Sequence, residues 1–178
     1  MATKNWVIDP NHSEIQFKVK HLMITNVSGS FNIFQASVQT TDEDFMKSTV
    51  NFSADVDSIS TGNEQRDGHL KNAEFFDSAN YPQIKFTATK FEAVDNDGSF
   101  ELYGDLTIRS ITHNIKLDVE FGGVVKDPYG NTKAGFTING KIKRKDFGLN
   151  WDAVTEAGGI VVSDEVKIAC EIQLIEQQ

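Results

Sequence analysis

Large apolar residues alternate with polar ones along most of this chain, with a period of two. Because successive side chains of a β-strand point to opposite faces, each such run is typical of a strand with one apolar and one polar face. A sheet made of many such strands must bury its apolar face against itself, in a closed barrel or in a sandwich. The clearest of the runs are residues 14–21, 50–56, 84–88, 100–108, 115–121, 136–142 and 166–174.

The barrel alternative matters for function, because about eight strands can enclose a hole for one apolar ligand. Strands of about ten residues, rising about 3.3 Å per residue and tilted by about 40°, would enclose a lumen roughly 25 Å long. That length approaches the ~30 Å hydrocarbon thickness of a bilayer. A long lipid tail could therefore lie lengthwise inside such a barrel.

One segment changes period and predicts a helix over about residues 63–77. Its apolar residues cluster at helical spacing between charged ones, and Ser60, Thr61 or Asn63 could cap its start. A single amphipathic helix in an all-β chain usually packs over a sheet edge or a barrel mouth. Leu70 and Phe75 would then plug the fold or form a lid.

The organisation of the chain predicts a single domain over residues 1–178, because no linker or low-complexity tract divides it. Turn residues separate several of the runs. Asp95-Asn96-Asp97-Gly98 predicts a hairpin, and Asp127-Pro128-Tyr129-Gly130 predicts a tight turn. Residues 150–159 are less regular and are expected to form a loop.

Composition and charge narrow the classes of partner. The chain carries a formal net charge of −9 and has 13 Phe among its 178 residues. The acidic balance should repel nucleic acid and anionic lipid headgroups, so any membrane contact would be local and hydrophobic rather than a broad basic patch. The Phe residues either pack the core or form the walls of a cavity.

Signals for targeting and redox chemistry are few. The N-terminus has no apolar stretch with a cleavage site, and no run approaches the length of a transmembrane helix. We expect a cytoplasmic protein as the sequence stands, or a periplasmic one if the chain is a mature form without its signal. The one cysteine, Cys170, lies on the apolar side of the last run and is expected to be a buried thiol.

The sequence holds no recognisable catalytic or metal-binding motif. There is no Gly-x-Ser-x-Gly elbow, no His-Glu-x-x-His run and no phosphate-binding loop, so we predict no catalytic residues and no metal site. Three polar residues remain of interest. His21 lies in phase with the apolar residues of its strand, and is either a hydrogen-bonded core histidine or a contact for a ligand's polar head. Arg66 and His69 either face water and fix the helix, or face the barrel mouth and bind a ligand oxygen.

An ordered set of motifs covers nearly the whole chain. These motifs are Trp6-x-Ile8-Asp9-x-x-His12-Ser13-x-Ile15-x-Phe17-x-Val19-x-His21, Val27-x-Gly29-x-Phe31-x-x-Phe34, Ser58-Ile59-x-Thr61-Gly62, Arg66-Asp67-x-His69-Leu70, Phe75-Phe76-Asp77, Tyr81-Pro82-x-Ile84-x-Phe86, Gly104-x-Leu106-Thr107-Ile108, Thr112, Gly130, Arg144-x-Asp146-Phe147-Gly148 and Ser163-Asp164-x-Val166. Together they resemble the YceI-like family. The chain departs from the family pattern at Ser110-Ile111, where Gly-Val is usual, and a side chain there would narrow the tunnel.

The resemblance implies an extended lipocalin-like antiparallel β-barrel whose pore holds a polyisoprenoid or a similar long amphiphile. Members of the family are associated with polyprenyl pyrophosphate, isoprenoid quinone and fatty amides, many are exported, and several form dimers. We therefore expect a long-chain isoprenoid or fatty lipid as ligand and a possible homodimer. We expect no other cofactor, no nucleic-acid partner and no stable membrane anchoring.

The first hypothesis is a soluble, non-enzymatic carrier that holds a polyprenyl phosphate, an isoprenoid quinone or a similar lipid in its pore. Its polar head would meet His21, Arg66 and His69. Its tail would meet the tunnel residues Phe17, Val19, Phe31, Phe52, Leu70, Phe75, Phe86, Leu106, Ile108, Leu117 and Phe136.

Two alternatives stay open. The barrel could be the dry chamber of an isoprenoid isomerase or cyclase, which would need an acid or base such as His21. The protein could instead be an interaction module whose lumen is filled by its own Phe side chains.

Overall fold

A computed structural model of the chain describes residues 2–94, 98–151 and 162–178. Strands dominate it, with one α-helix and three short 3-10 turns. The helical elements are η1 (Pro10–His12), η2 (Val56–Ser58), α1 (Glu64–Leu70) and η3 (Arg144–Phe147). The strands are β1 (Thr3–Ile8), β2 (Glu14–His21), β3 (Thr25–Phe31), β4 (Phe34–Thr41), β5 (Asp44–Asp55), β6 (Ile59–Ser60), β7 (Gln83–Ala93), β8 (Phe100–Ile108), β9 (Ile111–Lys126), β10 (Thr132–Lys143) and β11 (Val162–Gln177).

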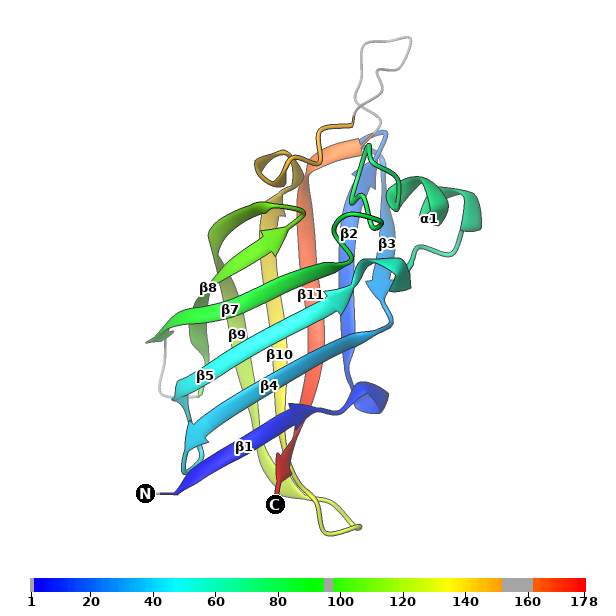
Figure 1. Cartoon of the computed structure of the whole chain (residues 1–178). Coiled ribbons are helices and arrows are strands. Elements are labelled where there is room, and N and C mark those ends of the chain that lie inside the picture. Colours follow the sequence, from blue (N-terminus) through cyan, green and yellow to red (C-terminus); the bar gives the residue numbers. More distant parts are fainter. Residues whose placement is uncertain (1, 95–97, 152–161) are drawn as a thin grey trace.

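In the described part of the chain, eight strands close into an antiparallel barrel in the order β1-β4-β5-β7-β8-β9-β10-β11 (Figure 1). Closure comes from the pairing of the first strand with the last, in which Asn5 lies opposite Gln177 and Ile8 opposite Leu174. This confirms the predicted lipocalin-like fold. The alternating runs place their apolar residues inside, as in β8, where Phe100, Leu102, Leu106 and Ile108 are all buried.

The last strand, β11, pairs with three other strands: β10 along one edge, and β1 and β2 along the other. The C-terminal part of β11 pairs with β1, whereas its N-terminal part pairs with β2, and Cys170 lies opposite Ile15 there. β3 and the short β6 extend the sheet from β2. The barrel wall therefore forks, and the β2–β3 extension runs toward the end of the molecule that carries α1 (Figure 1).

Aromatic rings fill the barrel near the end where the two chain termini lie. Phe45 packs against Trp6 and Phe136, with ring centroids 5.1 and 5.0 Å apart, and Phe121 lies 5.2 Å from Phe136. The indole nitrogen of Trp6 donates to the hydroxyl of Thr40 at 3.0 Å, so its one polar group is satisfied. This end of the barrel is closed by packed side chains.

The opposite end carries α1, which is shorter than predicted. The Asn63 side chain caps its start by accepting from the Arg66 amide at 3.0 Å, and the helix ends at Leu70 rather than at residue 77. The carbonyl of Asn72 then accepts from the amides of both Phe75 and Asp77 in a tight turn. The turn brings the successive Phe75 and Phe76 rings to the barrel interior, which a continued helix would separate by about 100°.

Two predicted turns have different outcomes. The tight turn at 127–130 is confirmed, because the amide of Gly130 donates to the carbonyl of Asp127 at 3.1 Å and Gly130 adopts φ +86°. β7 and β8 are paired antiparallel, with Ala93 opposite Phe100, as the predicted hairpin requires. Of that hairpin turn, residues 95–97 lie outside the described residues, as does most of the loop expected at 150–159.

Candidate functional site

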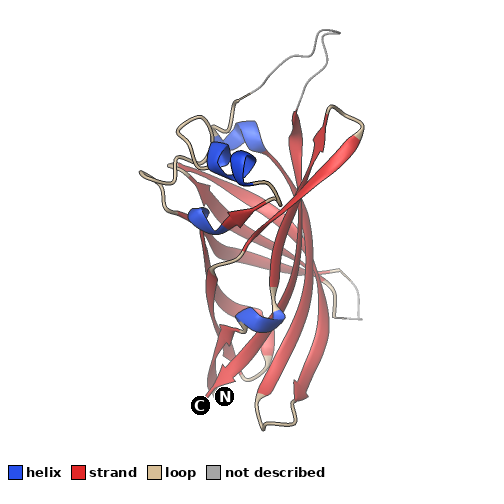
Figure 2. Ribbon diagram, turned by 90° about the vertical axis from the view of Figure 1, so that its right-hand side faces the viewer, coloured by secondary structure: helices blue, strands red, loops and turns tan. Residues whose placement is uncertain are grey.

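The barrel encloses a cavity of about 450 Å³. This volume lies within the roughly 300–1,000 Å³ that is typical of small-molecule sites. Apolar side chains from strands all around the barrel form its walls, and α1 with the turn after it covers one end (Figure 2). An open lumen of this kind contradicts the alternative of a core filled by Phe side chains.

All eleven residues predicted for the tunnel line this cavity, whereas their contact with a ligand stays a prediction. They reach it from five barrel strands, from the β2–β3 extension and from the helical segment. The residues are Phe17, Val19, Phe31, Phe52, Leu70, Phe75, Phe86, Leu106, Ile108, Leu117 and Phe136.

Glycines shape two of the walls. The ring of Phe17 lies directly over Gly29 on the neighbouring strand, and the ring of Phe86 lies over Gly104 in the same way. A Cβ at either glycine would collide with the ring. The small residues therefore let these rings lie flat against the wall, so that the lumen beside them stays open.

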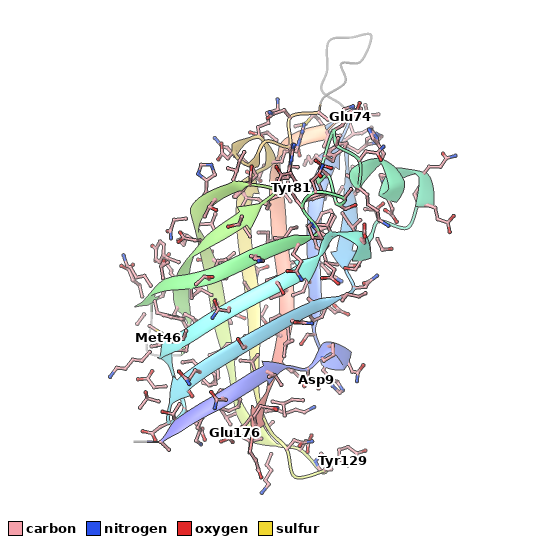
Figure 3. The ribbon with its side chains drawn as sticks, viewed as in Figure 1. Asp9, Met46, Glu74, Tyr81, Tyr129 and Glu176 are labelled. Atoms are coloured by element: carbon pink, nitrogen blue, oxygen red, sulfur yellow. The ribbon has the colours of Figure 1, made fainter. Side chains whose placement is uncertain are left out.

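The cavity mouth lies under α1, where the predicted head residues His21, Arg66 and His69 border it. His69 is held in an aromatic cluster, with its ring 5.1 Å from Phe75 and 5.2 Å from Trp151. Its Nε2 lies 2.7 Å from a carboxylate oxygen of Glu74, which marks this end of the molecule in Figure 3.

Arg66 is held by a threonine rather than by a carboxylate. Its Nε donates to the hydroxyl of Thr61 and its Nη2 to the carbonyl of the same residue, both at 2.7 Å. The Thr61 hydroxyl donates in turn to Asp67 at 2.6 Å. The guanidinium group is exposed, and these contacts fix it at the mouth while leaving part of its donor set facing outward.

His21 departs from the prediction of a hydrogen-bonded core histidine. It ends β2, where the strand has passed beyond the barrel wall, and its side chain is exposed at the border of the cavity. Among the described residues, its imidazole contacts no carboxylate or other hydrogen-bonding group. The alternation of β2 correctly placed His21 on the same side as the cavity-lining residues Phe17 and Val19. The strand extends beyond the buried core at this point, so the His21 side chain is exposed.

The expectation that Ser110-Ile111 narrows the tunnel is wrong. Arg109 and Ser110 form the tight turn between β8 and β9, and Arg109 adopts φ +57° there. Neither Ser110 nor Ile111 borders the cavity. The departure from the family pattern lies in a turn outside the lumen.

Arg144 is not among the predicted head residues, although the rarity of arginine in the chain marks it as a candidate. It is only 3% exposed and borders the cavity at the mouth. Its guanidinium donates to the carbonyls of Leu149 at 2.6 Å, Trp151 at 2.7 Å and Ser163 at 2.9 Å. It thereby ties the end of η3 to the start of β11. Its place in the motif Arg144-x-Asp146-Phe147-Gly148 is the further sequence signal for this position.

The charges that border the cavity are of one sign. Lys20, Arg66 and Arg144 border it near the mouth together with two histidines, and no Asp or Glu among the described residues does so. The remainder of the lining is almost entirely apolar. The site thus combines a hydrocarbon-like interior with a mouth suited to an oxygen-rich or anionic group.

Cys170 lies on the cavity wall and is buried, as predicted. Burial raises the pKa of its thiol to about 11, so the thiolate is scarce near neutral pH. No group of three or more His, Cys, Asp or Glu side chains capable of holding a metal ion occurs within the described residues.

Comparison with known proteins agrees with this architecture. The YceI-like domain matches residues 6–174. The chain belongs to the YceI-like family. A UPF0312 protein of Staphylococcus aureus (strain MSSA476) is 37% identical over 166 residues, which is 92% of each chain.

Solved structures share the YceI-like fold. A YceI protein of Campylobacter jejuni is 35% identical, with a TM-score of 0.75 over 90% of this chain and 91% of that one. BcnA of Burkholderia cenocepacia (20% identity, TM-score 0.80) covers 93% of this chain and 98% of its own. A polyisoprenoid binding domain of Saccharophagus degradans (16% identity, TM-score 0.68) covers 97% and 98%.

The helical content of the described residues includes no segment long and apolar enough to cross a membrane.

Proposed function

We propose that this YceI-like protein is a non-enzymatic carrier that holds a long amphiphilic isoprenoid, such as a polyprenyl phosphate or an isoprenoid quinone, in its barrel. The observation that carries the proposal is the apolar cavity of about 450 Å³ whose mouth is bordered by cationic groups and by no carboxylate of the described residues. A hydrocarbon tail fits the walls, and a phosphate or carbonyl oxygen fits Arg66 and His69.

Support for the ligand class comes from the shared fold. The structural neighbour from Saccharophagus degradans is described as a polyisoprenoid binding domain. The YceI-like domain covers residues 6–174, so nearly the whole barrel falls within the family match.

The arrangement of polar groups supports binding rather than catalysis. His21, the candidate acid or base, has no carboxylate partner among the described residues, and the buried Cys170 thiol is held protonated by its raised pKa. We therefore propose that the lipid leaves the barrel chemically unchanged.

Organic extraction of the purified protein, followed by mass spectrometry, tests the proposal. We expect an isoprenoid lipid in amounts comparable to the protein, and binding of added polyprenol or quinone to the extracted protein. Recovery of no lipid from several expression hosts, together with no binding of either added ligand, would overturn it.

A cavity-filling variant makes the test specific. Ala36 borders the cavity, whereas Gln35 precedes it on the outer face of β4. Ala36→Phe should lower the recovered lipid at least roughly tenfold, at a cost in stability of about 1–3 kcal/mol. Gln35→Phe is the matched control and should retain the lipid.

A further inference from the structure

A row of lysines crosses three neighbouring strands on the outer face of the sheet. Lys18 of β2 lies opposite Lys167 of β11, which lies opposite Lys141 of β10. Further lysines continue the row toward the cavity mouth. Together these exposed residues form the basic face: Lys18, Lys20, Lys141, Lys143, Lys145 and Lys167.

Most lysines of the basic face form no ion pair with the described residues. This holds for Lys18, Lys20, Lys141, Lys143 and Lys167. Lys145 is held in place by its backbone amide, which donates to the Asp164 carboxylate at 3.1 Å. The acidic residues on the same elements are Glu14, Asp146, Asp164, Glu165, Glu171 and Glu176. Glu165 lies directly opposite Lys143, whereas the row Lys18, Lys167 and Lys141 has no acidic residue in register with it. Like charges placed directly opposite each other destabilise a sheet. The row of lysines therefore lowers the stability of the fold rather than adding to it.

An apolar tip adjoins the basic face. Leu22, Met23 and Ile24 connect β2 to β3 and are 39%, 54% and 77% exposed. The amide of Ile24 donates to the carbonyl of His21 at 3.2 Å, which closes a two-residue turn. Leu22 and Met23 both adopt left-handed conformations, at φ 53° and 61°.

Large apolar residues are unusual in such a turn. Two-residue hairpins with positive φ at both positions are dominated by Asn, Asp and Gly, because these residues adopt the conformation with little strain. Here three consecutive apolar side chains face water instead. The hairpin therefore presents hydrophobic surface at a place where neither packing nor turn geometry calls for it.

The tip, the basic face and the cavity mouth lie at one end of the molecule. His21 and Val27, on the two strands next to the tip, both border the cavity, and so does Lys20 of the basic face. β2, β3 and the start of β11 run to the end that carries α1, away from the chain termini (Figure 1).

We infer that this end of the molecule docks on an anionic lipid bilayer, with Leu22, Met23 and Ile24 inserted among the acyl chains and the basic face against the headgroups. Lysine clusters near an apolar anchor are the chemistry that recognises such surfaces. The net charge of −9 had argued against a broad basic patch, but strand register gathers lysines that are far apart in the sequence. Docking places the cavity mouth at the membrane.

The inference goes beyond the proposed function, because docking on a bilayer needs no cargo. Flotation of the full chain with vesicles of phosphatidylcholine alone, or mixed with phosphatidylglycerol at roughly 7:3, measures it directly. We expect binding to the mixed vesicles, with weak or no binding to the neutral ones, and release at high salt. Since lipid extraction tests the proposed function separately, failure of one leaves the other standing.

Two pairs of substitutions test whether the basic face and the apolar tip are responsible for vesicle binding. Lys141→Gln with Lys167→Gln should weaken binding to the mixed vesicles roughly 20-fold, whereas Lys85→Gln with Lys126→Gln, which changes the charge equally at exposed sites elsewhere, should not. Leu22→Asn with Met23→Gly should also abolish most binding, and it suits the turn better, so misfolding cannot explain the loss.

Three results would overturn the inference. One is equal binding to neutral and anionic vesicles, and another is an equal loss in the Lys85 and Lys126 control. The third is binding of duplex DNA that matches vesicle binding and is unchanged by the tip variant, because that would assign the basic face to nucleic acid.

Discussion

At the scale of single residues, Asp9 shows how one buried charge fixes the barrel seam. It follows β1 and precedes η1, and its carboxylate accepts from His12 at 2.7 Å, Lys133 at 3.0 Å and the Asn11 amide at 3.1 Å (Figure 3). Its backbone amide donates to the Gln173 carbonyl of β11 at 2.8 Å. One residue thus connects the first strand to the last two.

The ionised form of Asp9 should contribute to stability. Burial by itself raises the pKa of this carboxyl group, but the hydrogen bonds from His12, Lys133 and Asn11 outweigh burial and hold the pKa below its ordinary value. A lowered folded-state pKa means stability that is present above the unfolded-state pKa of about 3.9 and is lost as the pH falls through the folded-state value.

Asp9→Asn should therefore lower the free energy of unfolding near neutral pH by about 1–3 kcal/mol. The difference from the parent protein should shrink as the pH falls below about 4, where the parent also loses the charge. Urea unfolding at a series of pH values measures this, with the exposed Asp57→Asn as control. Parallel pH profiles for the parent and Asp9→Asn would contradict it.

Cys170 supplies a second prediction at this scale. Because burial raises its pKa to about 11, its reaction with a maleimide should be slow near neutral pH and should keep accelerating up to about pH 10. In urea, the same thiol should react quickly with a pKa of about 8.5. If the reaction rate of the folded protein levelled off at about pH 8.5 instead, the thiol would be accessible to solvent. Bound lipid should slow the folded-state reaction further, since Cys170 borders the cavity.

At the scale of elements, hydrophobic alternation predicted most barrel strands and their inward faces, because that pattern is local. It overestimated the helix, since Phe75 and Phe76 satisfy a helical spacing and a turn equally well. The alternation could not show which strands pair with one another. The alternation placed Lys18 on the polar face of its strand. Only the strand register, however, brings Lys167 and Lys141 beside it.

The β2–β3 turn carries a prediction of its own. Leu22→Asn with Met23→Gly should raise the free energy of unfolding by about 1 kcal/mol, because both residues then adopt positive φ with less strain. Ile24→Ser removes an exposed apolar side chain without changing those two positions, and it should alter stability by less than about 0.5 kcal/mol. Urea unfolding of the three proteins decides this. A loss of stability in the double variant would show that the apolar tip supports the fold.

At the scale of the whole molecule, the proposed long-chain ligand would be subject to a limit on its binding affinity. At about 0.8 kcal/mol per buried methylene, a long tail would exceed the roughly 18–21 kcal/mol ceiling for non-covalent binding. Ordering of the tail must offset much of that gain. We therefore expect loose selection for tail length, with headgroup selectivity set by the mouth residues.

Removal of the lipid should lower the melting temperature, because a ligand bound only by the folded state stabilises it by mass action. Added polyprenol should restore the parent's melting temperature and should leave that of Ala36→Phe unchanged. Differential scanning calorimetry of extracted and reloaded protein measures both. An extracted protein that melts at the same temperature with and without added polyprenol would speak against cargo in the barrel.

The forked strand β11 bears on how the polypeptide is made. Since β1, β2 and β10 all pair with residues 162–177, the wall cannot close until that last segment has left the ribosome. Contacts so distant in sequence form late, and the earlier strands remain exposed meanwhile. Premature termination before residue 162 should consequently yield an aggregation-prone fragment rather than a smaller working barrel.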